Sequence, residues 1–377
     1  MLNRILGLCA LLALTACGGG SGPAATTQPQ SSQPKLGDAI DAIVQPYMAG
    51  AGVSAAVISI QKDGAPLYEH AYGYQDAAHT QPLAMTALFR VASVVKPVTA
   101  ATIQILAAQG KLALSDHVIC SGNNLPCWLP ATLLPASADA RVRDITLGQL
   151  IAHQGGWDRT LSGDPDIMEP AIRDALGKIT PPTREELIRY VLARPLDFTP
   201  GSRSAYSNFG YLLLGQVIEQ ASSTDYVSFV QRTLLAPLGI AAADFQQART
   251  LPADRNPREP AYLSTLMSPS VYTPGKLALA MDEGAETLNW TAAAGIITTA
   301  PAMARFAATY SLPDGAALAG GHHDGVKNGD VPGATSVVRQ LPSGVSYALY
   351  MNATAGFNDE QGPFLKQIDA AIAASVK

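Results

Sequence analysis

The chain contains 377 residues, of which 47% are hydrophobic and 15% are charged, and its formal net charge is −5. This length suits one large domain or two interleaved domains with a sizeable core. No basic stripe runs along the sequence, which argues against nucleic acid as a partner.

The first residues have the pattern of an export signal. Arg4 supplies a positive charge, and the apolar run Ile5–Leu14 that follows is too short to span a bilayer. Small residues then precede Cys17, and this ending resembles the lipobox of bacterial lipoproteins. The resemblance implies a signal peptide over residues 1–16 and a diacylglyceryl group on Cys17. An ordinary secretory signal, in which Cys17 is incidental, is the alternative.

The next segment consists mainly of Gly, Ser, Pro, Gln and Thr and has almost nothing to bury. We therefore expect a flexible tether over residues 17–36, followed by the folded domain over residues 37–377. Tether and lipid together predict an exported bacterial lipoprotein at the periplasmic face of a membrane, with the outer membrane preferred.

The folded region begins with the pattern of a β-hairpin. Val53–Gln61 alternates small and apolar residues, and Pro66–Tyr74 follows it across an Asp-Gly turn. Farther on, Val95–Gln109 has apolar residues at helical spacing and is followed by Gly110, so we expect a helix that stops there.

The remaining elements alternate in type along the chain. We expect helices at Arg184–Arg194, Gly210–Ala221 and Asp225–Leu235, strands at Ala293–Thr298, Ala334–Leu341 and Gly344–Met351, and helices at Pro301–Tyr310 and Phe364–Ser375. This order predicts an α/β (α+β) fold, with one antiparallel sheet formed from both chain ends, flanking helices and an inserted, mainly helical region. The sheet part is expected over residues 37–112 and 285–377, and the helical part over residues 113–284.

Two cysteines lie inside the folded region. Cys120 and Cys127 stand seven positions apart in a Gly/Asn/Pro-rich stretch of a chain that we expect to be exported. A local disulfide between them is therefore expected. Such a small loop would staple a surface segment rather than hold the core.

Several common site motifs are missing from the sequence. Without Gly-x-Ser-x-Gly, the nucleophile elbow of α/β-hydrolases has no support. Without His-Glu-x-x-His or Cys-x-x-Cys, a zinc site has none either, and no cofactor is implied.

The pattern Ser-x-x-Lys occurs three times, and the local structure expected around each copy separates them. One copy lies in the tether, and Ser59 to Lys62 lies on a predicted strand, where residues three apart face opposite sides. Ser93 and Lys96 lie at the start of a predicted helix, where such residues share a face and backbone N–H groups can hold an oxyanion. Ser93 is therefore the candidate nucleophile and Lys96 its partner.

Tyr206-Ser207-Asn208 is a candidate second element of the same site. A tyrosine with its ordinary pKa of about 10 is a poor base at neutral pH. We expect flanking cations to lower the pKa of Tyr206 by stabilising the phenolate.

The third candidate element is Lys327-Asn328-Gly329-Asp330, which leads to a Pro-Gly pair. It would suit a strand edge that lines a cleft, because glycine lets a substrate approach the backbone closely. Taken alone, the segment also fits a surface turn.

In this order, the three elements resemble the three motifs of the serine β-lactamase and penicillin-binding-protein superfamily. The tyrosine element is similar to that of class C β-lactamases, DD-peptidases and the related family VIII-type carboxylesterases. The family usually has Lys-Thr-Gly or His-Thr-Gly, whereas Asn328 stands in the middle here. His323 begins a competing His-x-Gly motif, but Lys327 has the spacing to the Pro-Gly pair that the family shows.

The resemblance implies a role for each matched residue. Ser93 would attack a carbonyl to form an acyl-enzyme, while Tyr206 and Lys96 shuttle the proton. Asn208 would hydrogen-bond the substrate or Lys96, and Lys327 would supply positive charge to the tyrosine or to a substrate carboxylate.

Further residues would shape the cleft. The oxyanion hole would come from the backbone N–H groups of Ser93 and Asp330. The Asp330 carboxylate would lie beside the cleft and disfavour anionic substrates such as penicillins. His153 and Trp157 would be wall residues, with a structural role for the histidine.

These inferences predict a serine hydrolase that acts through an acyl-enzyme on an ester, amide or β-lactam carbonyl of a small molecule or peptide. Esterase, β-lactamase and D-amino-acid peptidase are not separated, because the loops Leu161–Pro182 and Ile240–Pro274 carry no motif. The alternative is a non-catalytic lipoprotein that binds cell-wall peptides. The intact Ser/Lys/Tyr/Lys set argues against it, since a binding module needs no nucleophile.

Overall fold

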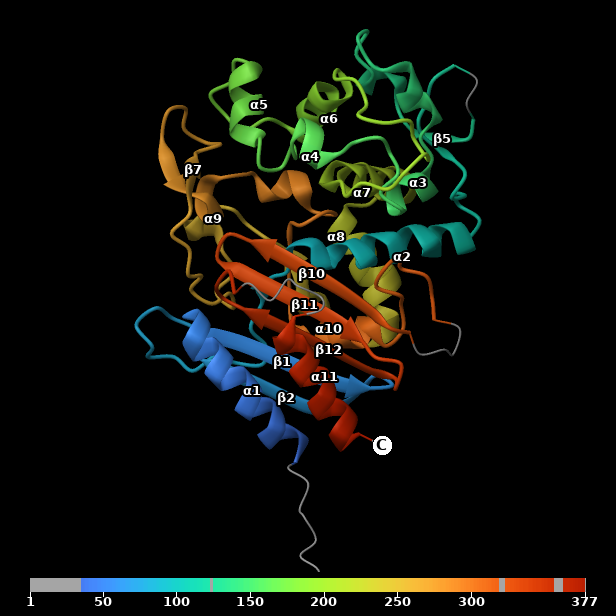
Figure 1. The fold of residues 1–377 in the computed structure, drawn as a ribbon. Helices are drawn as coiled ribbons and strands as arrows, with labels where there is room; N and C mark the ends of the chain where they lie inside the picture. Colours follow the sequence, from blue (N-terminus) through green and yellow to red (C-terminus); the bar gives the residue numbers. More distant parts are fainter. Residues whose placement is uncertain (1–34, 123–124, 319–322, 356–361, 377) are drawn as a thin grey trace, which may run out of the picture.

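The computed structural model describes residues 35–122, 125–318, 323–355 and 362–376 (Figure 1). The expected signal peptide, Cys17 and nearly all of the tether lie outside these residues. Within them, no helix has both the length and the apolar character that crossing a membrane requires.

A five-stranded antiparallel sheet forms the lower half of the molecule in Figure 1, with the strand order β10-β11-β12-β1-β2. Its first and last strands in the chain lie side by side, because β1 pairs with β12. The bounds are Ala55–Lys62 for β1, Ala65–Gly73 for β2, Gly325–Val331 for β10, Ala334–Gln340 for β11 and Val345–Met351 for β12. This arrangement confirms the predicted fold class, a sheet built from both ends of the chain.

Tight two-residue turns connect β1 to β2 and β10 to β11 in this sheet. Asp63 and Gly64 both have a positive φ, 50° and 79°, which is the backbone that a two-residue turn between antiparallel strands requires. Pro332 and Gly333 connect β10 to β11, and Gly333 has a φ of 85°. The predicted hairpin therefore forms, and the Pro-Gly pair ends the strand that carries Lys327.

Alternating side chains divide the sheet between two apolar cores. Ile58 and Leu349 lie on the face covered by α1 (Leu36–Ala51) and α11 (Pro363–Ser375). Val57 and Tyr350 lie on the other face, in the larger core that also includes residues of α2 (Val95–Ala108) and α10 (Ala300–Ala307). Burial on both faces makes the sheet a rigid base for the strand edge at β10.

The helical layer lies above the sheet in Figure 1 and supplies the other wall of the site. Its helices are α3 (Leu147–Ile151), α4 (Arg159–Ser162), α5 (Glu169–Ala175), α6 (Arg184–Leu192), α7 (Asn208–Ser222) and α8 (Tyr226–Val230), and the short helix α9 (Ala280–Glu283) follows later. The described residues also contain the short strands β3 (Phe89–Arg90), β4 (His117–Ile119), β5 (Cys127–Leu129), β6 (Phe245–Gln247), β7 (Met267–Pro269), β8 (Leu277–Leu279) and β9 (Ile296–Thr298).

The region expected to be mainly helical contributes a strand to a second sheet. In the order β3-β9-β6, strand β6 pairs with β9, which lies in the expected sheet part. The inserted region therefore contributes β6 to the three-stranded sheet before the chain reaches β9. Strands β7 and β8 form a further two-stranded hairpin in the same inserted region.

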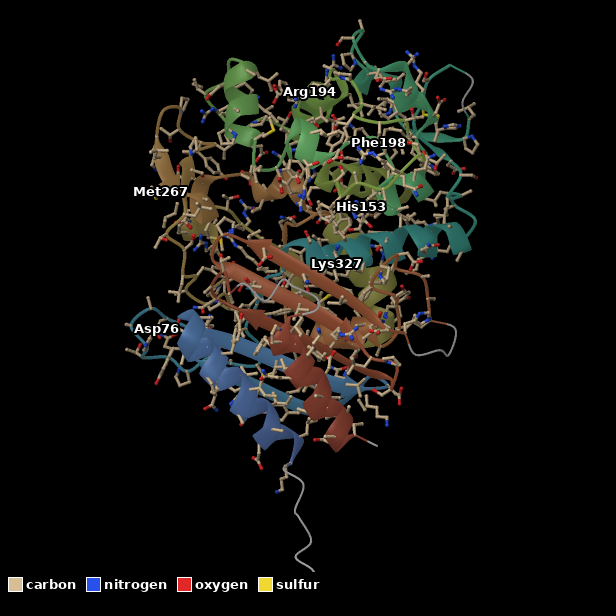
Figure 2. All side chains as sticks on the ribbon, viewed as in Figure 1. Asp76, His153, Arg194, Phe198, Met267 and Lys327 are labelled. Atoms are coloured by element: carbon tan, nitrogen blue, oxygen red, sulfur yellow. A yellow bond between two sulfur atoms is a disulfide. The ribbon has the colours of Figure 1, made fainter. Side chains whose placement is uncertain are left out.

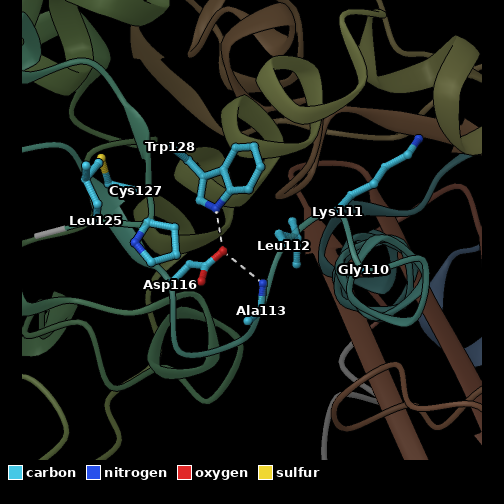
Figure 3. A pocket seen from close by; sticks show the side chains of 9 residues that line it. Gly110, Lys111, Leu112, Ala113, Asp116, Leu125, Cys127 and Trp128 are labelled. Carbon is cyan, nitrogen blue, oxygen red and sulfur yellow. Dashed lines mark hydrogen bonds between the residues drawn. The ribbon is translucent and has the colours of Figure 1, made fainter.

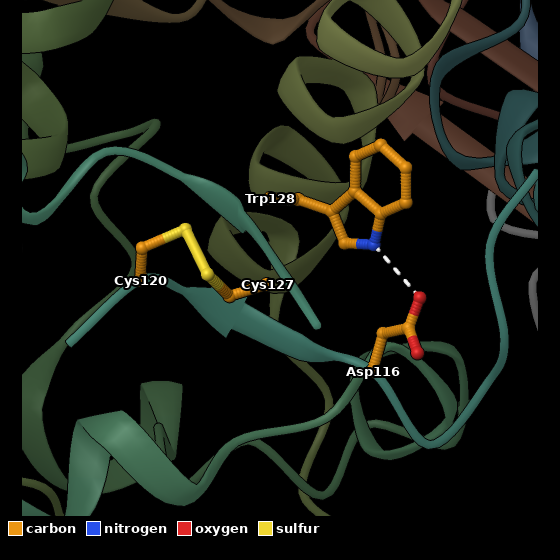
Figure 4. Close-up of a disulfide and its surroundings, with 4 residues drawn as sticks. All are labelled: Asp116, Cys120, Cys127 and Trp128. Carbon is orange, nitrogen blue, oxygen red and sulfur yellow. Dashed lines mark hydrogen bonds between the residues drawn. A yellow bond between two sulfur atoms is a disulfide. The ribbon is translucent and has the colours of Figure 1, made fainter. Parts of the chain in front are cut away.

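Cys120 and Cys127 form a disulfide beside the parallel pair of β4 and β5 (Figure 4). Next to it, Trp128 Nε1 donates a hydrogen bond to Asp116 Oδ2 at 3.1 Å. Asp116 and Trp128 also line a surface hollow together with Leu125 (Figure 3). No candidate catalytic residue lines this hollow.

Candidate active site

Ser93 lies in a tight turn directly before α2. The 3₁₀ turn covers Ala92–Val94, and α2 begins at Val95. Ala92 has a φ of 46°, a left-handed conformation that costs free energy for a residue with a Cβ. The turn keeps Ser93 half-buried at the N-terminal end of α2, where the helix dipole favours negative charge.

Lys96 is buried directly beneath the serine, with 1% of its surface exposed. Its Nζ donates to Ser93 Oγ at 3.1 Å, to Asn208 Oδ1 at 2.6 Å and to the Ala293 carbonyl oxygen at 2.7 Å. Burial lowers the pKa of Lys96 from 10.5 to about 7. A large fraction of Lys96 is therefore a neutral amine at neutral pH, able to accept a proton from the serine.

Tyr206 completes the cluster from the segment before α7. Its hydroxyl oxygen lies 2.5 Å from Ser93 Oγ. Three cations surround its ring: Lys96 Nζ, Arg159 Cζ and Lys327 Nζ lie 4.9, 4.6 and 5.2 Å from the ring centroid.

The expected lowering of the Tyr206 pKa is not what this environment produces. Burial raises the pKa of Tyr206 and outweighs Lys327, which lowers it. The phenol therefore keeps its proton at neutral pH. The sequence predicts flanking cations but not the loss of water around the hydroxyl, which penalises the phenolate more than the cations stabilise it.

Strand β10 brings the third element to the serine. It is an outer strand of the sheet, and it carries Lys327 over the Tyr206 ring. A Cβ on Gly329 would lie 2.2 Å from the Val91 carbonyl oxygen and 3.0 Å from Ser93 N. Glycine is needed there because the strand passes so close to the turn that holds the nucleophile.

The other residues of this element have different places. Thr335 Oγ1 donates to Asp330 Oδ1 at 2.8 Å. Because side chains alternate along a strand, Asn328 and Asp330 lie on the sheet face opposite to that of Lys327. The Asp330 carboxylate therefore does not border the cleft as expected. His323 is exposed ahead of β10, so Lys327 is the residue of the two competing motifs that contacts Tyr206.

Asn208 bonds within the protein, which decides between its two expected roles. Its Oδ1 accepts from Lys96, and its Nδ2 donates to Asp164 Oδ2 and to Asp166 Oδ2, both at 2.9 Å. Sequence reasoning missed these two aspartates and also Arg159. An Asp-Pro-Asp sequence in a loop is too common to mark a site, so only the folded chain identifies them.

His153 forms a wall of the site from the helical layer, while Lys327 comes from the sheet edge (Figure 2). The His153 ring centroid lies 4.7 Å from that of Tyr206, and His153 Nδ1 accepts a hydrogen bond from Ser207 N at 3.2 Å. Burial lowers the pKa of His153 to about 3, so the ring is neutral. It therefore supports the tyrosine segment. Trp157 is buried edge-on against Phe209.

An apolar pocket of about 340 Å³ adjoins the cluster. Ala294 lines it, next in sequence to Ala293, whose carbonyl oxygen accepts from Lys96. Asp166 lines it as well. The other main lining residues are Ile167, Leu266, Met281, Trp290, Val331 and Pro332. The mainly apolar lining, which also includes Arg90, suits an apolar group of a substrate.

Among the described residues, no three His, Cys, Asp or Glu side chains group closely enough to hold a metal ion. The chemistry available from the described side chains is proton transfer to and from a serine hydroxyl, with cations and a phenol close by.

The chain is similar in sequence to several curated proteins. The chain is 30% identical to esterase EstB of Burkholderia gladioli over 213 residues, which cover 55% of this chain and 51% of the esterase. It spans about half or less of the length of the first curated relatives it matches.

Solved structures show the same fold. A class C beta-lactamase aligns with a TM-score of 0.65 and 16% identity, covering 93% of this chain and 99% of that one. EstCE1, a hydrolase with promiscuous acyltransferase activity, aligns with a TM-score of 0.61 and 20% identity, covering 90% and 98%. Identities this low show the fold alone. Residues 40–360 match the family model named Beta-lactamase, and this match over most of the chain shows that the protein belongs to the Beta-lactamase family of serine hydrolases.

Proposed function

We propose that this protein is a serine hydrolase that cleaves carboxylic esters through an acyl-enzyme on Ser93. The observation that carries the proposal is the placement of Ser93 Oγ, 3.1 Å from the buried Lys96 Nζ and 2.5 Å from the Tyr206 hydroxyl. The nucleophilic oxygen of Ser93 thus lies beside both a base, Lys96, and a proton donor, Tyr206.

Acylation follows from the protonation states of this cluster. Neutral Lys96 accepts the Ser93 proton as Oγ forms a bond to the ester carbonyl carbon. The backbone N–H groups of Ser93 and Asp330 hold the oxyanion. The carbon–oxygen bond to the alcohol then breaks, Tyr206 gives its proton to the departing oxygen, and the Lys96 ammonium restores the tyrosine proton.

Deacylation uses the same groups in reverse. Water attacks the acyl carbon and gives a proton to Tyr206 as the tyrosine passes its own proton to neutral Lys96. The bond from the acyl carbon to Ser93 Oγ then breaks, and the Lys96 ammonium returns that proton to Oγ. Lys327 lies over the tyrosine ring and offsets the negative charge that develops on its oxygen while the proton moves.

The preference for esters rests on the apolar pocket beside the cluster. Its lining favours an alkyl or aryl group over a charged one. The similarity to a protein named an esterase points the same way. β-Lactam and D-amino-acid peptide bonds are the competing substrates within the family.

Intact-protein mass spectrometry after treatment with a fluorophosphonate tests the nucleophile. We expect one adduct on the wild type, one on the exposed-serine control Ser202→Ala and none on Ser93→Ala. An adduct on Ser93→Ala would refute the assignment. An unlabelled wild type that still binds cell-wall peptides would support the non-catalytic alternative.

We also propose that Cys17 carries a lipid that holds the enzyme at the periplasmic face of the outer membrane. The small residues before Cys17 and the polar tether after it support this proposal. Fractionation of cells that express the wild type or Cys17→Ser tests it. The wild type should sediment with membranes and the variant should not, and equal partition of both would refute the anchor.

A further inference from the structure

The Asn208 side chain uses its full hydrogen-bonding capacity inside the protein. Its Oδ1 accepts from Lys96 Nζ at 2.6 Å and from the Tyr206 hydroxyl at 3.3 Å. Its Nδ2 donates to Asp164 Oδ2 and to Asp166 Oδ2, each at 2.9 Å. An amide nitrogen has two N–H groups, and each has a carboxylate acceptor here.

The two aspartates occupy a costly position. Asp164 is 5% exposed, and Arg159, the cation paired with it, lies 3.9 Å from Asp164 Oδ2. Asp166 Oδ1 accepts from Ile167 N at 2.7 Å, and its side chain borders the apolar pocket. Asp166 is only half-buried, but desolvation and the neighbouring Asp164 raise its pKa to about 7. Holding the two carboxyl groups together is therefore costly, and a stability role explains them poorly.

A consequence for substrate recognition follows from the occupied amide. A substrate with an acylamino group beside the scissile carbonyl needs a donor for the oxygen of that group. Asn208 contacts Lys96, and its acceptor Asp166 lines the apolar pocket, so the Asn208 amide is the candidate donor to that oxygen. Both Asn208 N–H groups already donate to carboxylates. The lone pairs of these carboxylates would repel the oxygen of a substrate acylamino group.

We propose that Asp164 and Asp166 are positioning and specificity residues, which hold the Asn208 amide with its oxygen toward Lys96 and withhold its N–H groups from the substrate. The site thereby selects simple carboxylic esters over esters and lactams that carry an acylamino group. This inference rests on the proposed function, since it concerns the acyl group delivered to Ser93.

The same carboxylates act on Lys96 through their charge. Asp166 and Asp164 favour the ammonium form of Lys96, whereas burial and Arg159 oppose it and lower its pKa. The rings of Tyr206 and Tyr211 face the ammonium from α7 and the segment before it, with Nζ 4.9 and 5.6 Å from their centroids. Neutralising an aspartate therefore lowers the pKa of Lys96 further. The fall of kcat/KM at acidic pH, which we call the acid limb of the pH profile, then moves to lower pH.

The experiment compares two substrates across variants of the full chain. kcat/KM is measured for p-nitrophenyl butyrate and for the p-nitrophenyl ester of N-acetylalanine, between pH 5 and 9. The variants are Asp166→Ala, which frees one Asn208 N–H group, and Asp166→Asn, which keeps an acceptor but removes the charge. Asp254→Asn, which neutralises an exposed carboxylate, is the matched control.

We expect Asp166→Ala to raise the ratio of N-acetylalanyl to butyryl ester hydrolysis about tenfold, the effect of one restored hydrogen bond. Asp166→Asn should move the acid limb to lower pH and leave this ratio closer to that of the wild type. The control should change neither quantity.

Two outcomes would overturn the proposal. An unchanged ratio and an unchanged limb in both folded variants would show that the aspartates are merely structural. A limb that vanishes in Asp166→Asn would show that Asp166 itself is the titrating base. Fluorophosphonate labelling of each variant keeps the two proposals apart, because labelling at Ser93 persists if only the positioning role is wrong.

Discussion

Replacement of Lys96 by arginine tests the base directly. Arginine keeps a positive charge and several donors near Ser93, but a guanidinium with a pKa above 12 cannot take up the serine proton. The variant therefore separates the lysine's role as a proton acceptor from its role as a cation.

The magnitude follows from the burial of the lysine. With the pKa of Lys96 lowered to about 7, half of the molecules carry the neutral amine at pH 7. An unperturbed lysine would be neutral in about one molecule in three thousand. If the neutral amine is the base, Lys96→Arg should lose at least about a thousandfold in kcat/KM.

The assay is the initial rate of p-nitrophenyl butyrate hydrolysis between pH 5 and 9. For the wild type, kcat/KM should fall about tenfold per pH unit as the pH drops below 7, because protonation removes the base. His153 cannot produce this limb, since burial lowers its pKa to about 3. Desolvation and Asp164 raise the pKa of Asp166 to about 7, so this group titrates in the same range, and the profile of Asp166→Asn separates it from Lys96. The exposed Lys111→Arg serves as the matched control and should behave as the wild type.

The reasoning is refuted if Lys96→Arg keeps more than a tenth of the wild-type kcat/KM. It is also refuted if the wild-type profile is flat between pH 5 and 8. In either case the serine proton leaves by a route that does not use the lysine.

Three further variants test other parts of the site and fold. Gly329→Ala should lower kcat/KM at least about tenfold and also lower Tm, because its Cβ would meet a backbone atom, the Val91 carbonyl oxygen, at 2.2 Å; wild-type kinetics would contradict this. Tyr206→Phe removes the hydroxyl that lies 2.5 Å from Ser93 Oγ. It should lower kcat about 10²–10⁴-fold for an ester of a poor leaving group and less for a p-nitrophenyl ester, whose leaving group needs no proton. Equal losses for the two esters would argue against proton donation by Tyr206. Cys120→Ser opens the disulfide loop and should lower the unfolding free energy in urea by about 2 kcal/mol while kcat/KM is unchanged, and a large activity loss would link the loop to the site.

Local signals in the sequence predicted most of the sheet and the helix beneath the nucleophile. The Asp-Gly turn marks the β1–β2 hairpin, and the apolar spacing before Gly110 marks α2, because each depends on neighbouring residues alone. The N-terminal helix α1 was missed although Ile40, Val44 and Met48 recur at helical spacing on its buried face. The pairing of β6 with β9 has no local signal, since it joins segments about fifty positions apart.

Motif order and the start of a helix are enough to single out Ser93, Lys96 and Tyr206 from the sequence. The protonation states of Lys96 and Tyr206 depend on how the chain packs around them. Burial raises the pKa of Tyr206 and lowers that of Lys96, so the buried amine is the better base. Packing also brings Asp164 to Asn208 across 44 positions of sequence. Desolvation depends on every group packed around a site, and no spacing within a motif encodes it.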